Sequence, residues 1–158
     1  MRLEYWILIG LWVIGITAFI LFLRHNPRKG ILAFMMFQSI IWLFNMFLFK
    51  YDFISAPIRE LPKAHDFPIT LDYFFHPMLF TLFYNHKKGK ISYLLIWASA
   101  ATLLDVVLER YTGIIEFKKM TWYGLFFYFL FLYSMSQSFC NWFYKDKSLF
   151  QADRLETQ

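Results

Sequence analysis

The chain has one cysteine, Cys140, and only six glycines and five prolines among its 158 residues. A single thiol cannot form an intrachain disulfide, and the zinc-binding CxxC spacing is missing from the sequence. The sequence also contains no Walker A loop and no GxGxxG, GxSxG or HExxH motif. These absences exclude a disulfide framework and give no support to nucleotide-binding, serine-hydrolase or zinc-protease chemistry.

Charged side chains are scarce as well, at 17%, whereas 59% of the residues are hydrophobic and 23% are aromatic. A soluble domain of this length cannot bury that much apolar surface. The formal net charge is +5, but the Lys and Arg residues stand in small groups between apolar runs and form no continuous basic face. We therefore expect a lipid bilayer as the surroundings of the protein and no nucleic-acid partner.

Five apolar stretches predict an all-α fold, a polytopic integral membrane protein with a bundle of five transmembrane helices. About twenty apolar residues, at 1.5 Å each, cross a hydrocarbon core of roughly 30 Å. The predicted helices are residues 5–23, 30–49, 68–84, 91–109 and 121–144. They make a single transmembrane domain, 1–144, with an outer loop at 50–67 and a polar carboxyl-terminal tail at 145–158 that we expect to fray. The first stretch is longer than the apolar region of a signal peptide and has no A-x-A cleavage site, so we expect it to be retained.

The distribution of Lys and Arg predicts the orientation, because cytoplasmic loops retain these residues preferentially. With the amino terminus outside, nine of them are cytoplasmic and seven are not. Six of the nine lie in the two short hairpins, where the bias counts most. We therefore predict that the N-terminus is outside and the C-terminus is cytoplasmic.

Ionisable residues interrupt two of the apolar stretches. Asp72 and His76 stand four apart in the third stretch, and Asp105 and Glu109 stand four apart in the fourth, so each pair lies on one helix face. A short hairpin joins these two helices and makes them antiparallel neighbours. Helix rise puts Asp72, Asp105 and Asn45 about 6 to 8 Å below the outer surface, and His76 about 12 Å below it. We predict a polar cluster of these five residues near the outer face.

Three interpretations of this polar cluster are open. It can fix the register of the helices through hydrogen bonds, or bind protons or ions in a permease or channel subunit. It can also hold a divalent metal in a metal-dependent membrane enzyme. The metal candidates are His76, Asp72, Asp105 and Glu109, with help from His65, because one histidine is few for zinc. We expect no cofactor, assign no catalytic residue and favour a protein that is not an enzyme.

Proline and glycine positions add a prediction about the backbone. Pro77 predicts a kink that frees a carbonyl one turn earlier, near Tyr73. The kink either opens a cavity beside His76 or only serves helix packing. Gly10 and Gly15 are five apart and do not form a GxxxG contact face, so we attach no role to them.

Small and polar residues recur on the last two stretches. Ser134, Gln137 or Ser138, and Asn141 follow a helical spacing. Such a stripe lines a crevice, binds another subunit or ties neighbouring helices together. In the fourth stretch, four small residues favour a close approach of a neighbouring helix: Ala98, Ser99, Ala101 and Thr102.

The five spans, with "FPITLDYFFHPMLF" opening the third and "LLDVVLERYTG" closing the fourth, resemble small uncharacterised multi-pass membrane proteins of endospore-forming Firmicutes. This resemblance implies a plasma-membrane location and carries over no assigned activity and no functional residue. We expect an accessory or structural membrane subunit that works in a homo-oligomer or beside a membrane partner subunit. An ion- or proton-coupled permease or channel subunit is the alternative, and a metal-dependent membrane enzyme is the second alternative.

Overall fold

The computed structural model of the protein describes residues 3–23, 27–58, 69–85 and 91–156. Most of this length is helical, in agreement with the all-α prediction. The helices are α1 (Leu3–Leu23), α2 (Pro27–Lys50), α3 (His76–Asn85), α4 (Ile91–Tyr111) and α5 (Trp122–Glu156), and a π-helix, η1 (Thr70–Phe75), directly precedes α3.

Two of the helix ends differ from the predicted boundaries by three residues or more. The α2 helix begins at Pro27 instead of residue 30, because proline is well suited to the first helical turn and charge in that turn does not stop a helix. The α5 helix continues to Glu156, through the polar tail that we expected to fray. At 1.5 Å per residue its 35 residues are about 52 Å long. This length exceeds the roughly 30 Å of a hydrocarbon core.

Three of the described helices are long and apolar enough to cross a membrane, and these are α1 (over Glu4–Leu21), α2 and α4. The third predicted span is divided between η1 and the ten residues of α3. The fifth predicted span carries the serine, glutamine and asparagine residues of the polar stripe, which lower its hydropathy.

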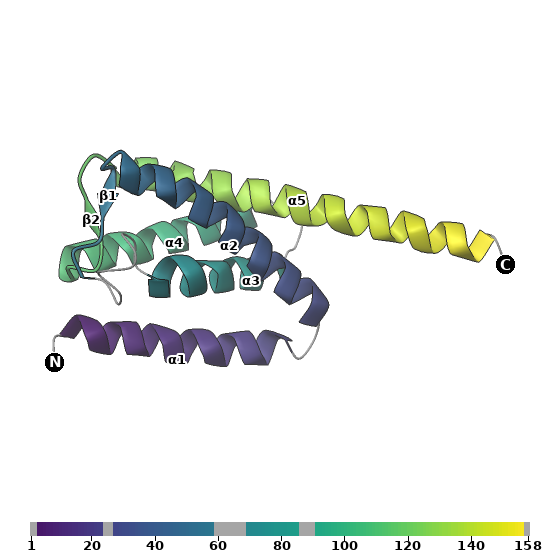
Figure 1. Ribbon diagram of the computed structural model, residues 1–158, viewed down its shortest axis with the longest axis horizontal. Coiled ribbons are helices and arrows are strands. Elements are labelled where there is room, and N and C mark those ends of the chain that lie inside the picture. Colours follow the sequence, from purple (N-terminus) through teal and green to yellow (C-terminus); the bar gives the residue numbers. More distant parts are fainter. Residues whose placement is uncertain (1–2, 24–26, 59–68, 86–90, 157–158) are drawn as a thin grey trace.

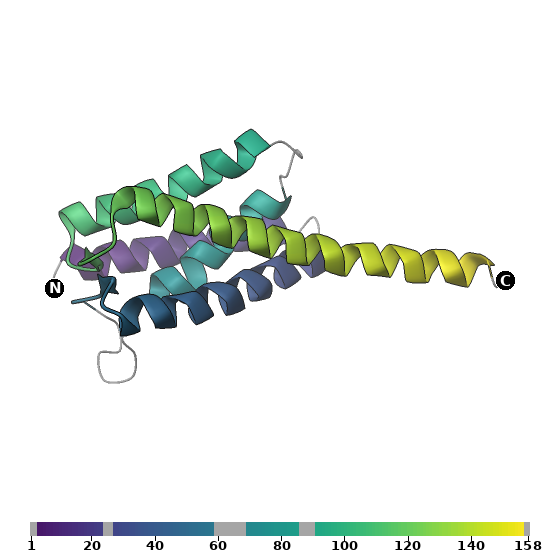
Figure 2. The same cartoon turned by 90° about the horizontal axis from the view of Figure 1, so that it is seen from above.

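The helices run side by side between two ends of the molecule, and the last part of α5 extends beyond the others (Figures 1 and 2). The α2 helix packs against α3 and α5, α4 packs against α5, and α1 lies along η1, α2 and α3. On α4, Ala98, Ala101 and Thr102 are buried, as close helix packing requires, whereas Ser99 is exposed.

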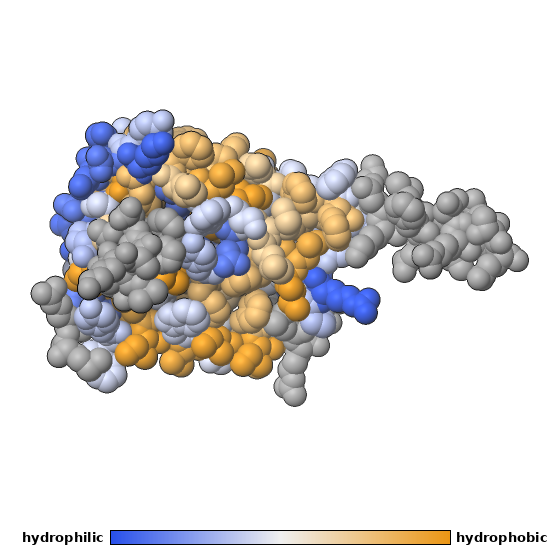
Figure 3. Space-filling view, in the orientation of Figure 1, coloured by the Kyte–Doolittle hydropathy of each residue, from blue (hydrophilic) through white to orange (hydrophobic). Residues whose placement is uncertain are grey.

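Aromatic side chains fill the centre of the bundle. The Phe37 ring of α2 stacks on Phe80 of α3 with centroids 4.7 Å apart. Tyr133 of α5 meets the edges of Phe37, Phe80 and Phe83 at 5.3 to 5.4 Å. All four side chains are almost completely buried, whereas much of the outer surface is apolar (Figure 3). An apolar exterior over a packed aromatic interior is the pattern expected for a helical bundle in lipid.

One end of the bundle is closed by loops. Asp52 has a φ of 56° and ends α2 in a Schellman arrangement, in which the Phe53 N–H donates to the Leu48 carbonyl at 2.9 Å. The chain then forms β1 (Ile54–Ser55), which pairs antiparallel with β2 (Glu116–Phe117) between α4 and α5. The sequence patterns did not predict this pairing of two loops 61 residues apart.

Candidate functional site

The third predicted helix is irregular just before Pro77. Proline has no N–H, and its ring clashes with the carbonyl of the residue four positions earlier, which is Tyr73. In the structure, the His76 N–H donates to the carbonyl of Leu71, five residues earlier, which is the hydrogen bond of a π-helix. The irregularity that Pro77 predicts therefore takes the form of η1, with Asp72 inside it and His76 directly after it.

His76 lies at the centre of the candidate site. Its side chain is 1% exposed, and its Nε2 atom lies 3.2 Å from Oδ1 of Asp105 on α4. The distance between these two atoms is short enough for an ion pair. Their alignment does not meet the geometry of a hydrogen bond, so Asp105 Oδ1 has no hydrogen-bond partner among the described residues. The Phe129 ring of α5 packs against the imidazole with centroids 4.9 Å apart. His76 Nδ1 is buried and also has no hydrogen-bond partner in the part of the chain that the structure describes.

A second polar contact joins α2 to α5 at the same site. Tyr128 Oη donates a hydrogen bond to Asn45 Oδ1 at 2.5 Å. Asn45 is 5% exposed, so this short bond is shielded from the surroundings. Two polar contacts therefore connect two different pairs of helices, α3 with α4 and α2 with α5.

A cavity of about 20 Å³ lies between these groups. Its polar lining consists of Asn45, Asp72, His76, Asp105 and Tyr128. Its apolar lining consists of Ile41, Phe49, Ile54, Ile115, Leu125 and Phe129. Such a volume accommodates about one water molecule, and a water in a polar cavity needs two to four hydrogen-bonding partners, which this lining supplies.

The structure brings four of the five predicted cluster residues to this cavity and leaves the fifth outside it. Asn45, Asp72, His76 and Asp105 line the cavity and are each at most 8% exposed. Their side chains are buried between the helices. Glu109 is half-buried and is not part of the lining, because a position four residues beyond Asp105 is about 6 Å further along the helix axis.

Sequence reasoning missed two aromatic members of the site, Tyr128 and Phe129. Both lie in the run "WYGLFFYFLFLY", where no single aromatic residue is distinguished from its neighbours. Helix rise gives a usable signal, since Tyr128 is six residues after the start of α5 and therefore about 9 Å along it. That depth lies between the 6 to 8 Å predicted for Asp72, Asn45 and Asp105 and the 12 Å predicted for His76.

The metal interpretation gains no geometric support from the described residues. No group of three or more His, Cys, Asp or Glu side chains in this part of the chain is placed to hold a metal ion. His65, which we considered as an additional ligand, lies outside the described residues.

The second polar stripe lies on the outer surface of α5. Ser134, Ser138 and Asn141 are exposed, and Gln137 is half-buried. At one end of the stripe, Tyr84 Oη donates to Asn141 Oδ1 at 3.3 Å. At Asn141 the stripe therefore ties α5 to α3. Ser134 and Ser138 are exposed on the surface of the bundle, where lipid or another subunit can contact them.

Comparison of the chain with protein-family models, with curated proteins and with solved structures found no match.

Proposed function

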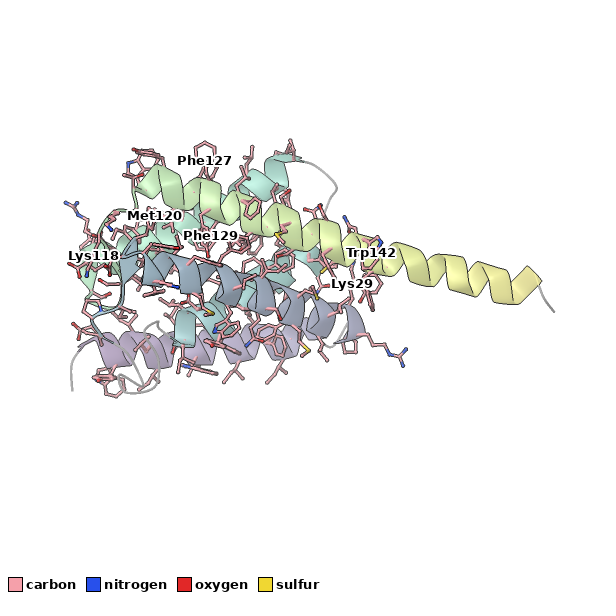
Figure 4. The ribbon with its side chains drawn as sticks, turned by 45° about the horizontal axis from the view of Figure 1, so that its top comes forward. Lys29, Lys118, Met120, Phe127, Phe129 and Trp142 are labelled. Atoms are coloured by element: carbon pink, nitrogen blue, oxygen red, sulfur yellow. The ribbon has the colours of Figure 1, made fainter. Side chains whose placement is uncertain are left out.

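We propose that this protein is an accessory or structural subunit of the plasma membrane with five membrane spans. In this proposal η1 with α3, and α5, cross the bilayer beside α1, α2 and α4. The side-by-side course of these helices supports the proposal (Figures 1 and 2). The amino terminus is outside and the carboxyl terminus is cytoplasmic, so Lys118 belongs to the outer end and Lys29 to the inner end; these residues lie at opposite ends of the bundle (Figure 4).

The observation that carries this proposal is the burial of the polar cluster between four helices. The pair of His76 and Asp105 connects α3 to α4, and the Tyr128 to Asn45 hydrogen bond connects α2 to α5. The cavity between them is only about 20 Å³. A cluster that joins four helices around a space for one water is suited to fixing helix register. Interhelical polar contacts of this kind are worth about 0.6 to 2 kcal/mol each.

A double-mutant cycle tests the register role. His76→Ala, Asp105→Ala and the double variant are purified, and the free energy of unfolding is measured by titration with SDS in mixed micelles. Each single variant should be less stable than the wild type, with a coupling of about 0.6 to 2 kcal/mol between the two positions. Glu116→Gln is the control, because Glu116 is an exposed carboxylate in β2 at the closed end of the bundle. No coupling between His76 and Asp105 would contradict the register role.

A proton-coupled permease subunit is the second candidate function. The buried His76 Nδ1, without a hydrogen-bond partner among the described residues, faces a site that also holds two carboxylates and space for one water. Imidazole, carboxylate and water are the components of proton relays in membranes.

Flux measurements separate the two candidates. Wild-type protein in liposomes is placed under a pH gradient and under Na⁺ and K⁺ gradients. The accessory role predicts no flux above protein-free liposomes, whereas a permease subunit predicts a flux that Asp105→Asn abolishes. Such a flux would replace the first proposal by the second.

A further inference from the structure

The face of α5 that points away from the bundle has a regular spacing of exposed residues. The buried face consists of Leu125, Phe129, Leu132, Tyr133, Ser136 and Cys140. On the opposite side, four exposed positions follow one another at intervals of four, three and four residues: Phe127, Phe131, Ser134 and Ser138. We call these four residues the outer α5 face. Figure 4 shows Phe127 pointing away from the other helices and Phe129 pointing toward them.

The serines of the outer α5 face have no hydrogen bonds within the described chain. Ser134 and Ser138 appear in no hydrogen bond to any described residue. Some other helical hydroxyls, such as Ser39 with Met35 at 2.8 Å and Thr17 with Val13 at 2.7 Å, donate to the carbonyl four residues earlier. Exposed hydroxyls without partners are unfavourable in hydrocarbon, where no water is available. A contact with another helix removes that cost.

The spacing and the chemistry of this face fit a second copy of the same chain. Intervals of four and three residues form the seam along which two helices cross at about 20°. A serine hydroxyl both donates and accepts hydrogen bonds, so Ser134 and Ser138 can pair with their own copies. Two copies inserted with the same orientation are related by a two-fold axis along the membrane normal, which places identical faces of α5 against each other. An unrelated partner would need a matching set of polar residues, whereas a second copy has it already.

The length of α5 agrees with this arrangement. The helix continues beyond the other helices of the bundle (Figure 1). The sequence there keeps the same four-and-three spacing with Lys145, Ser148, Ala152 and Leu155. An isolated helical segment of about a dozen residues is only marginally stable in water. A paired α5 would give this extension a neighbour over its whole length.

We propose that two copies of the protein associate in parallel along the outer α5 face, with Ser134 and Ser138 at the helix–helix contact. This inference rests on the proposed function, because it requires α5 to cross the membrane. It names the partner of the accessory subunit as a second copy of this chain.

Cysteine cross-linking in native membranes tests the dimer. Cys140, which is buried on the inner side of α5, is first replaced in a Cys140→Ala background. Ser134→Cys and Ser138→Cys are then oxidised with copper phenanthroline, and Ser99→Cys is the matched control, because Ser99 is an exposed serine on α4. Both α5 variants should yield a disulfide-linked product of twice the chain mass, and the α4 variant should not.

Three outcomes would overturn the dimer. Both α5 variants could remain monomeric after oxidation, the Ser99→Cys variant could cross-link as efficiently as they do, or the α5 variants could cross-link to a protein of another mass. Labelling with a membrane-impermeant maleimide separates this failure from failure of the five-span proposal. A cysteine at position 134 that is protected but not cross-linked refutes the dimer alone. A cysteine there that is labelled on intact cells refutes the span as well.

Discussion

A methyl group added at Gly15 should loosen the contact between α1 and η1. Gly15 is buried on α1, and a Cβ atom there would lie only 2.4 Å from Cε1 of Phe74 in η1. The Phe74 ring stacks on Trp12 with centroids 4.3 Å apart, and Trp12 Nε1 donates to Thr70 Oγ1 at 2.8 Å. Gly15 therefore provides the space in which Phe74 joins α1 to the π-helix that carries the polar cluster.

The size of the effect follows from this geometry. Carbon atoms pack at about 3.5 to 4.0 Å, so the ring must retreat by more than about 1 Å. Overpacking of this kind costs about 1 to 3 kcal/mol, and loss of the aromatic stack costs about 0.5 to 1.5 kcal/mol more. Alanine is favoured over glycine in a helix by about 1 kcal/mol, which partly offsets these losses. Gly10→Ala on the same helix is the control, because it has the same gain and no atom lies within 4 Å of its added Cβ. The variant Gly15→Ala should therefore be about 1.5 to 4.5 kcal/mol less stable than Gly10→Ala.

The measurement is the free energy of unfolding of both variants by SDS titration in mixed micelles. Adding Phe74→Ala to each variant removes the ring that clashes, so the difference between the two glycine positions should then disappear. If Gly15→Ala is as stable as Gly10→Ala while Phe74 is present, Phe74 does not pack against Gly15 and the reasoning is refuted.

Two further substitutions test the interior of the bundle by the same unfolding measurement. Tyr128→Phe removes the hydroxyl that donates to Asn45 Oδ1 and should lower the free energy of unfolding by about 1 to 3 kcal/mol. A stability equal to that of the exposed Tyr123→Phe variant would contradict the buried contact. Phe80→Ala removes a fully buried ring and should cost about 3 to 5 kcal/mol. The control is Ile96→Ala on α4, where the side chain is 62% exposed and the free energy of unfolding should change little. Equal losses of stability in the two variants would contradict the packing of α3.

The location of the helices could be read from the sequence to within three residues, except for the end of α5. Uncharged apolar runs must become helices in lipid, because a helix satisfies all of its backbone hydrogen bonds internally. The larger differences are at the start of α2 and the end of α5. At both places the sequence becomes polar, which ends an apolar run, but the backbone remains helical. The structure continues α5 as a helix to Glu156, through the tail that we expected to fray.

The level of the candidate site was also accessible to sequence reasoning. Counting the helix rise placed Asn45, Asp72 and Asp105 at similar depth, and these residues line one cavity with His76. Depth does not specify how each helix is rotated about its own axis. For that reason Tyr128 was overlooked among similar aromatic residues. Glu109 was included because it shares a helix face with Asp105, but it lies about 6 Å further along the axis and is not part of the cavity lining.

The sequence by itself determined that this chain is helical, that it is apolar enough for a membrane and where its buried polar groups stand along each helix, because these are properties of consecutive residues. Only the tertiary structure decided which groups meet. The approach of Nε2 of His76 to Asp105, the space at Gly15 for Phe74 and the pairing of β1 with β2 each depend on residues far apart in the chain. Such contacts are set by helix rotation and by the π-helix before Pro77, and neither follows from local hydropathy.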